Sequence, residues 1–338
     1  MIYHHLFEKL RKKDRVQAAI IGAGHFGTAV VTQQQHTPYL SVTMVADKKP
    51  ENAKNSFLRA DISESDIVYC DNAQEAQSAI DSGKFVYTDR PEIIMDVDSI
   101  DVVCEGTGVP EAGARYCKLA IEKGKHIAII NKELDSAIGP ILRKLAEEHG
   151  VVYTQVDGDQ PALLIQMVEW ARTIGLTVIS AGKARDGEFI YNEQDHTVSI
   201  YADGITVHDD YKVEVPESFR KYFDMIPEGK TEEYLQKRAE VLKDLPNAGA
   251  FDLCELTVIA NATGLKPACA PLTKGTLRIT ELPVAYCSKK DHGIYEEEGI
   301  VDVLTCLRRP DESGMGGGVY MVVRCDNAYS NYILTTKG

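Results

Sequence analysis

The segment AAIIGAGHFGTAV, from Ala18 to Val30, joins an apolar run to a cluster of glycines and then to a helical pattern. Its three glycines have the spacing G-x-G-x-x-G directly after the expected strand. The first permits a tight turn, the second lets a pyrophosphate approach the backbone, and the third lets the helix pack closely on the strand. Free amides and the positive end of the helix dipole would face the phosphates. We therefore expect these residues to bind a dinucleotide: Gly22, Gly24, His25, Phe26 and Gly27.

The next apolar run, SVTMVAD, ends at Asp47, about 20 residues after Gly27. A carboxylate at this separation typically binds the ribose hydroxyls of the nucleotide. Lys48 and Lys49 follow it and could neutralise a 2′-phosphate, so NAD and NADP both remain open. The structural alternative is an ordinary strand-to-helix turn with spare glycines.

From Arg15 to Gln155, short runs of β-branched residues alternate with amphipathic stretches. Continuous apolar runs are typical of parallel strands that are buried on both faces. This pattern predicts an α/β fold, with a Rossmann-type doubly wound parallel sheet in an NAD(P)-binding domain at residues 1–156. Long helix candidates and a β-rich end then predict a mixed α+β domain for substrate binding and dimerisation at 157–338. Its last strands are expected at YMVVR and YILTT.

The formal net charge of -14 argues against binding to nucleic acid, which requires a basic face. The eight cysteines form no CxxC pair, as is usual in a reducing cytoplasm. We expect no membrane span, because no run approaches about twenty consecutive apolar residues. The N-terminal segment MIYHHLFEKLRKKDR is expected to form a short basic amphipathic helix rather than a signal peptide. A soluble cytoplasmic protein is the resulting expectation.

A second glycine cluster, CEGTGVPEAG, follows the apolar run IDVVC and precedes a helix. This places Gly106, Thr107 and Gly108 at the carboxyl edge of the predicted sheet, where ligands of such folds gather. We expect them to face the nicotinamide side of the nucleotide. A helix start with Pro110 in its first turn is compatible with that function.

The run IINKELD ends a strand at the same edge of the sheet. Asn131 is expected beside the nucleotide. Lys132 is a candidate catalytic residue, since a lysine there can hold an anionic group or donate a proton. The alternative is a solvated lysine that begins a helix.

The segments VDGDQP and SAGKARDGE carry the strongest candidates for chemistry. Asp157 and Asp159 are close enough to require a shared cation or substrate, although Asp159 could equally be a helix N-cap. Gln160 follows as a candidate substrate-binding residue. Lys183 is a candidate catalytic lysine, and Arg185 a candidate substrate-binding residue.

The helix candidate FDLCELTVIANATG contains Asp252, Glu255 and Asn261 in an otherwise apolar segment. Because the two acids are three residues apart, they share a helix face and could look into a cleft. We expect Glu255 and Asn261 to bind substrate. An ordinary surface stripe is the alternative.

Together, IIGAGHFGT, VVCEGTGVPEAG, IINKELD and VDGDQP with SAGK resemble the homoserine dehydrogenase-like oxidoreductases. They look most like the branch with the alternative 1-deoxy-D-xylulose 5-phosphate reductoisomerases (DRL) and related sugar-acid oxidoisomerases. The resemblance implies an NAD(P)-dependent homodimer or higher homo-oligomer acting on a small hydroxy-keto substrate with a phosphate or carboxylate. Lys183 would polarise or protonate the carbonyl, and Lys132 and Arg185 would anchor the anion. A reductoisomerase would also hold a divalent cation, Mg²⁺ or Mn²⁺, at Asp157, Asp159 or Glu255.

The chain departs from this pattern in three ways. Homoserine dehydrogenases carry a lysine four residues after the helical aspartate, where this chain has Leu256. The segment GTxNYI is missing. The sequence stops at Gly338 before the small C-terminal SAF domain usual in the reductoisomerase-like branch, so either the sequence is truncated or this member lacks that domain. Two other readings stay open, a plain hydroxy-acid dehydrogenase without metal and a non-catalytic dinucleotide sensor.

Overall fold

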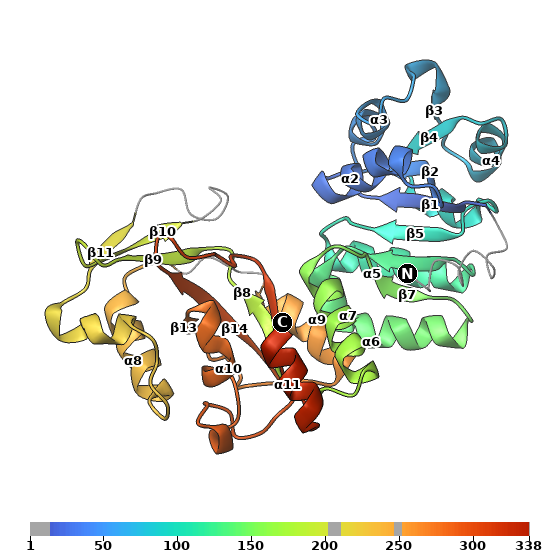
Figure 1. Ribbon diagram of the computed structural model, residues 1–338. Coiled ribbons are helices and arrows are strands. Elements are labelled where there is room, and N and C mark those ends of the chain that lie inside the picture. The colour runs from blue at the N-terminus through green and yellow to red at the C-terminus, as the bar shows by residue number, and fades with distance from the viewer. Residues whose placement is uncertain (1–13, 202–210, 247–251, 338) are drawn as a thin grey trace. The chain divides into compact units, whose positions relative to one another are not determined.

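The computed structural model describes residues 14–201, 211–246 and 252–337. The chain divides into two compact units, Met1–Val156 and Asp157–Gly338 (Figure 1). The helix expected at the N-terminus lies outside the described residues. Within the described part of the chain, no helix combines the length and apolarity needed to cross a membrane.

Unit 1 is built on a seven-stranded, wholly parallel sheet with the order β3-β4-β2-β1-β5-β6-β7. Helices α2 and α3 pack on one face, and α4, α5 and α6 pack on the other. The strands are β1 (Val16–Ile21), β2 (Leu40–Ala46), β3 (Ile67–Tyr69), β4 (Phe85–Thr88), β5 (Val102–Glu105), β6 (His126–Ile129) and β7 (Tyr153–Gln155). The helices are α2 (His25–Gln33), α3 (Pro50–Leu58), α4 (Ala73–Asp81), α5 (Pro110–Glu122) and α6 (Lys132–Glu148). The predicted doubly wound α/β fold is confirmed.

Unit 2 contains a mixed sheet in which β14 is the central strand. It pairs in parallel with β8, β9, β12 and β13, while β15 lies antiparallel to β8. The strands are β8 (Thr177–Ala184), β9 (Glu188–Asn192), β10 (Thr197–Tyr201), β11 (Lys212–Glu214), β12 (Lys266–Pro267), β13 (Gly275–Leu277), β14 (Ile300–Arg308) and β15 (Val319–Arg324). The helices are α7 (Gln160–Thr173), α8 (Thr231–Leu242), α9 (Asp252–Thr263), α10 (Leu282–Ala285) and α11 (Ala328–Lys337).

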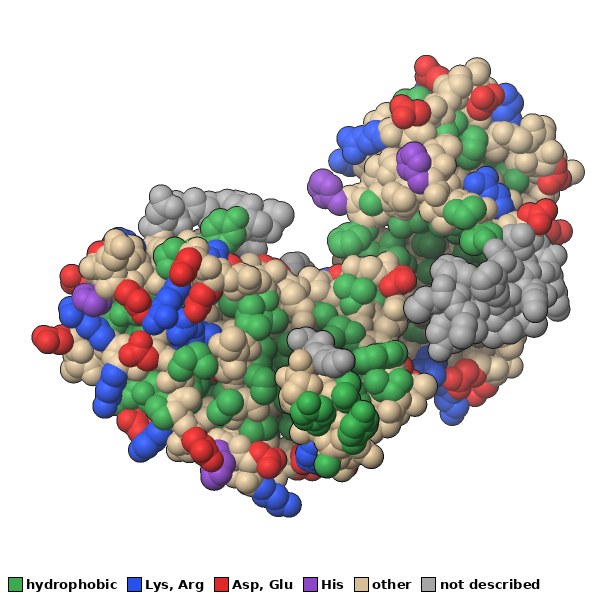
Figure 2. Space-filling model, in the orientation of Figure 1, with side chains coloured by type: hydrophobic (Ala, Val, Ile, Leu, Met, Phe, Trp, Pro, Cys, Tyr) green, Lys and Arg blue, Asp and Glu red, His purple; other side chains and the backbone are tan. Residues whose placement is uncertain are grey.

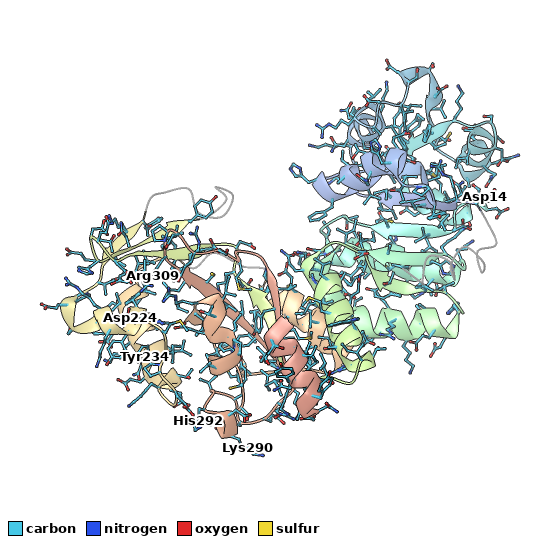
Figure 3. The ribbon with its side chains drawn as sticks, viewed as in Figure 1. Asp14, Asp224, Tyr234, Lys290, His292 and Arg309 are labelled. Atoms are coloured by element: carbon cyan, nitrogen blue, oxygen red, sulfur yellow. The ribbon has the colours of Figure 1, made fainter. Side chains whose placement is uncertain are left out.

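Two apolar cores lie on opposite faces of this sheet. Helices α7 and α9 cover Ala181 and Val303 on one face. Helices α8 and α10 cover Leu304 and Cys306 on the other. At the edge of the unit, the Nη2 atom of Arg309 is 3.6 Å from Oδ1 of Asp224, and both side chains are marked in Figure 3.

The end of the chain differs from the sequence expectation. YILTT was expected to be a strand, but Ala328–Lys337 forms the helix α11. Asn327 Oδ1 accepts a hydrogen bond from the Ser330 amide, 3.0 Å away, and so caps the start of the helix. The hydroxyls of Thr335 and Thr336 donate to carbonyls one turn back, which removes the usual conflict between threonine and a helix. Local capping therefore outweighs the β-preference of the short run Tyr332–Thr336.

Candidate functional site

A cluster of buried charges lies between strand β8 and helix α9 of unit 2. Lys183, only 1% exposed, places its Nζ atom 2.5 Å from Glu255 Oε2 and 3.4 Å from Asp252 Oδ1. Asp186 Oδ1 is 3.8 Å from the same ammonium group. Arg185 Nε is 3.4 Å from Asp252 Oδ2. Two cations and three carboxylates therefore occupy one small region, which we call the Lys183 cluster.

Strand and helix geometry explain why these groups meet. Lys183 lies opposite Val303 of β14 and Val319 of β15, so β8 is held on both sides. Asp252 and Glu255 are three residues apart and share one face of α9, as the sequence predicted. Both are buried, which rules out the alternative of an exposed surface stripe.

Hydrogen bonding in the Lys183 cluster is incomplete. Arg185 is 5% exposed and Asp252 3% exposed, yet among the described residues Nε of the arginine and both carboxylate oxygens of the aspartate have ion-pair contacts at 3.4 Å but no well-formed hydrogen bond. Buried polar atoms are normally paired, and each unpaired one costs about 1–3 kcal/mol. Buried donors and acceptors without good hydrogen bonds, fixed beside a charged lysine, are typical of a site that binds a polar ligand.

Burial and neighbouring charges shift the pKa values of Lys183 and Asp252. Burial lowers the pKa of the Lys183 ammonium, but the hydrogen bond to Glu255 and the nearby carboxylates outweigh it, and the net pKa is raised. The lysine is therefore protonated at neutral pH. Burial also raises the pKa of Asp252, more than Lys183 and Arg185 lower it. Asp252 can consequently exchange a proton at a higher pH than an exposed aspartate does.

A glycine-rich loop, 314–318, lies against the start of this cluster. Its shape is held by Glu188, which accepts hydrogen bonds from the amides of Met315 (2.5 Å) and Gly316 (2.9 Å). The Gly317 carbonyl accepts a hydrogen bond from Gln160 Nε2 at 3.3 Å, and the Gly317 amide donates to the Arg185 carbonyl at 3.0 Å. Gln160, predicted to bind substrate, thus contacts a loop that is bonded to Arg185.

The glycine turn of unit 1 has the shape that a dinucleotide requires. Gly22 has φ +101°, and a Cβ there would lie 2.5 Å from the Gly106 carbonyl oxygen. A Cβ on Gly27 would overlap the Gly22 carbonyl. Gly24 differs, because its Cβ position has no atom within 4 Å, and helix α2 after it has no side-chain cap. Open space before uncapped helix amides fits a pyrophosphate.

Asp47 is bonded to the glycine turn. Its Oδ2 accepts a hydrogen bond from the Ala23 amide at 2.8 Å, and its Oδ1 accepts one from the Lys49 amide at 2.9 Å. Oδ1 also accepts a hydrogen bond from Asn52 Nδ2 at 3.3 Å, so Oδ2 is the oxygen with a second lone pair toward a ribose bound beside the turn. His25 and Phe26 are exposed at the start of α2.

The second glycine cluster is fixed by a buried acid that the sequence reasoning missed. Glu105, with 0% exposure, accepts a hydrogen bond from the Thr107 amide at 2.9 Å. Burial raises the pKa of this carboxyl more than its hydrogen bonds lower it. Gly108 has φ +66°, and Asn131 caps helix α6 through the Leu134 amide. Glu105 is the last residue of an apolar strand and precedes a glycine, and this position could have indicated a buried acid at the site.

Other predicted residues lie outside these groupings. Asp159 caps α7 through the Gln160 amide, so the N-cap alternative holds. Asp157 is exposed and accepts a hydrogen bond from Gln166. Lys132 is half-buried at the first position of α6. Asn261 is exposed, about 120° around α9 from Glu255, and so faces away from Lys183.

Asp157 and Asp159 do not form a cation site with a third ligand. Across 14–201, 211–246 and 252–337, no group of three or more His, Cys, Asp or Glu side chains is placed to hold a metal ion.

Asp186 and Asp252 also belong to the Lys183 cluster but were not predicted as site residues. For Asp186 the signal was its position three residues after Lys183, in the turn that follows the same strand. For Asp252 it was the i,i+3 spacing to Glu255.

Replacing Lys183 by methionine should destabilise the protein at neutral pH. Removing one partner of a buried ion pair costs about 3–5 kcal/mol, because Asp252 and Glu255 lose their counter-charge. The folded pKa of Asp252 is already raised, so its ionisation opposes folding as the pH rises above the ordinary value of 3.8. Urea unfolding at pH 5.5 and 8 should show that the loss in Lys183→Met is larger at pH 8. Equal losses at both pH values, or no partial rescue by adding Glu255→Gln, would contradict this account.

Gly24→Ala should weaken nucleotide binding without weakening the fold. The added methyl meets no protein atom within 4 Å, but it occupies the space next to the uncapped amides of α2. We expect NADH and NADPH affinity to fall at least tenfold by calorimetry, with a melting temperature within about 2 °C of the wild type. Ala29→Ser, on an exposed position of the same helix, is the matched control. Unchanged affinity in Gly24→Ala would show that the turn does not bind a dinucleotide.

Comparison with known proteins identifies a family. A family model described as the catalytic domain of oxidoreductase DRL matches residues 158–221 and 232–337, which include the whole Lys183 cluster. A 1-deoxy-D-xylulose 5-phosphate reductoisomerase from Chlorobium chlorochromatii is 31% identical over 101 residues, 27% of this chain and 26% of that protein. This chain thus spans about a quarter of the length of that relative.

Solved structures give weaker similarity. An S. aureus homoserine dehydrogenase is 20% identical, with 42% of this chain and 33% of that chain covered and a TM-score of 0.31. An NAD-binding protein from Listeria innocua is 17% identical, with 54% and 48% covered and a TM-score of 0.32. The family match, by contrast, covers half of the chain. This protein therefore belongs to the DRL oxidoreductase family and is an oxidoreductase.

Proposed function

We propose that the protein is an NAD(P)-dependent oxidoreductase that acts on a small hydroxy-keto substrate bearing a phosphate or carboxylate. The observation that carries this proposal is the Lys183 cluster, a buried charged lysine beside Asp252 and Arg185, whose mutual contacts at 3.4 Å leave hydrogen-bonding capacity unused among the described residues. The open space at Gly24 supports a nicotinamide dinucleotide as the cofactor, which when bound supplies or accepts a hydride.

In the direction of reduction, a carbonyl gains one hydride and one proton. Lys183, held charged by Glu255 and Asp252, donates a hydrogen bond to the carbonyl oxygen and stabilises the negative charge that develops there. It then gives its proton to that oxygen. The neutral amine that results regains a proton from solvent, and Asp252, only 3.4 Å from Nζ and with a raised pKa, is placed to relay it. Oxidation of the alcohol uses the same steps in reverse.

The substrate anion is assigned to Arg185, and the predicted role of Lys132 in anion binding stays untested. The Arg185 Nε contacts Asp252 only at 3.4 Å and makes no well-formed hydrogen bond among the described residues, and arginine recognises carboxylates and phosphates through its forked donors. Glu255 remains bonded to Lys183 and orients it, rather than binding the substrate hydroxyl directly. Neither Asn261 nor Asp157 has a role in this reaction.

A reductoisomerase is the second candidate, favoured by the name of the Chlorobium relative. Such an enzyme rearranges the carbon skeleton before the same reduction, and the resemblance seen in the sequence associates that step with a divalent cation. EDTA separates the two candidates, because a plain dehydrogenase would continue to turn over in its presence.

A screen of NADH and NADPH with sugar phosphates and hydroxy-keto acids tests the proposal by thermal shift and by absorbance at 340 nm. On the substrate found, Asp252→Asn should lower kcat/KM by about 10²–10⁴-fold, the usual contribution of a proton-transfer group. Nucleotide affinity should be unchanged, because unit 1 is unaltered. Unchanged turnover in Asp252→Asn would remove Asp252 from the mechanism. Nucleotide binding without turnover of any substrate would favour the sensor alternative.

A further inference from the structure

Unit 2 contains a cavity on the opposite face of its sheet from Lys183. The volume of the cavity is about 410 Å³, which lies in the usual range for small-molecule sites. The sheet contributes Ile300, whose side chain packs on the side of α8 and α10. Lys183 contacts α9, which covers the other face. The cavity is therefore separate from the Lys183 cluster.

A buried acid, Asp302, holds two segments of the cavity wall together. It has 0% exposure and lies on β14, two residues after Ile300. Its carboxylate accepts a hydrogen bond from the Tyr295 hydroxyl at 2.9 Å and another from the Thr273 amide at 2.8 Å. Tyr295 and Thr273 both line the cavity. The two segments are therefore fixed to the same strand of the sheet.

The loop that carries Thr273 has a strained backbone. Leu272 and Lys274, on either side of it, are left-handed, with φ of +59° and +57°. Residues other than glycine adopt this conformation at an energetic cost, and such positions cluster at functional sites. The buried side chain of Leu272 and the bond to Asp302 hold the loop in this shape. A wall that is already ordered loses less entropy when a ligand binds.

The charged side chains that line the cavity are all acidic. They are Glu232, Glu296 and Glu297, and each is paired with a lysine outside the lining. Lys266 Nζ lies 2.9 Å from Glu297. Lys289 Nζ lies 2.5 Å from Glu296 but 3.6 Å from Glu232. Among the described residues, three carboxylates thus share two ammonium groups, and Glu232 is the least closely paired of them. The rim can therefore accept one further positive charge.

Much of the remaining lining is apolar. It includes Leu235, Pro267, Ala268 and Ile294. Figure 2 shows acidic side chains beside the histidine at the lower edge of unit 2, which Figure 3 labels His292 and which is two residues before Ile294. An apolar recess with an acidic rim suits a molecule with a hydrocarbon body and one positive end, and it disfavours phosphates and carboxylates.

We propose that this cavity is a second binding site, which takes a small organic cation with an apolar body, such as a primary alkylammonium or arylalkylammonium compound. The ammonium group binds Glu232, and the hydrocarbon part lies against Leu235 and Ile294. No residue of the Lys183 cluster lines the cavity, so this proposal does not rest on the proposed function.

Protection of a cysteine from alkylation tests the site on the full chain. Cys269 is exposed and lines the cavity, so a bound molecule should slow its reaction with iodoacetamide. The probes are phenethylammonium, hexylammonium and phenylacetate at constant ionic strength, and peptide mass spectrometry measures the rate. Both cations should protect Cys269 with a half-maximal effect at or below about 1 mM, and phenylacetate should be at least tenfold weaker. Cys325, which is outside the lining, is the internal reference and should react at an unchanged rate.

Two variants test where the probe binds, with phenethylammonium affinity measured by calorimetry. Glu232→Gln removes the least closely paired carboxylate and should weaken binding about threefold, since a pair with an exposed acid contributes modestly. Glu233→Gln is the matched control, because Glu233 lies in the same first turn of α8 but does not line the cavity. Ala268→Phe fills the apolar part and should abolish binding, while far-UV circular dichroism and the NAD(P)H thermal shift stay unchanged.

Three outcomes would overturn the proposal. The first is that neither cation slows alkylation of Cys269 at 10 mM, and the second is that phenylacetate binds as tightly as phenethylammonium. The third is equal affinity in Glu232→Gln and Glu233→Gln. This last comparison holds even if Ala268→Phe does not fold, because the Glu232 side chain is 71% exposed and its replacement disturbs no core. Absence of turnover at Lys183 would leave all three results unaffected.

Discussion

The ion pair between Lys183 and Glu255 is the interaction on which the second unit depends. An ammonium and a carboxylate that are each at most 2% exposed lose most of their hydration, and only close pairing compensates. The pair joins residues 72 positions apart and connects a central strand to the helix that covers it. Asp252 beside this pair makes no well-formed hydrogen bond among the described residues, so the arrangement that closes the core also leaves hydrogen-bonding capacity next to Lys183.

Placement of the pair follows from the sheet. Lys183 is flanked by β14 and β15, and a Cβ on the preceding Gly182 would collide with the Asp302 carbonyl, so β8 has little freedom to shift. A lysine on so rigid a strand keeps its position relative to α9, which is what a proton donor requires. In the homoserine dehydrogenase pattern the lysine follows the aspartate on one helix. Here Leu256 stands at that position, and a lysine from the strand occupies the same helix face as Asp252.

Features that depend on neighbouring residues could be predicted from the sequence, whereas contacts between distant segments could be predicted only in part. The turn at Gly22 and the carboxylate of Asp47 were predictable because spacing alone determines how they lie in a parallel α/β unit. The partnership of Lys183 with Glu255 was not, since it depends on which strand lies under α9. Asp159 stayed ambiguous because one residue type serves both as cap and as ligand. The strand predicted at YILTT was wrong because the prediction considered the β-branched residues and not the helix cap at Asn327.

The two sides of helix α9 have different surroundings and different residues. Its inner side must hold Asp252 and Glu255 against Lys183, and its outer side is nearly free of charge. A helix that begins with two buried acids starts at an energetic disadvantage, although the acids lie in its first turn, where the helix dipole favours negative charge. Packing must supply the rest, and the core contacts of Leu256 and Ile259 cover only one side. The contacts of Asp252 and Glu255 with Lys183 therefore help to hold α9 on the sheet, so the position of the helix and the geometry of the Lys183 cluster depend on the same ion pairs.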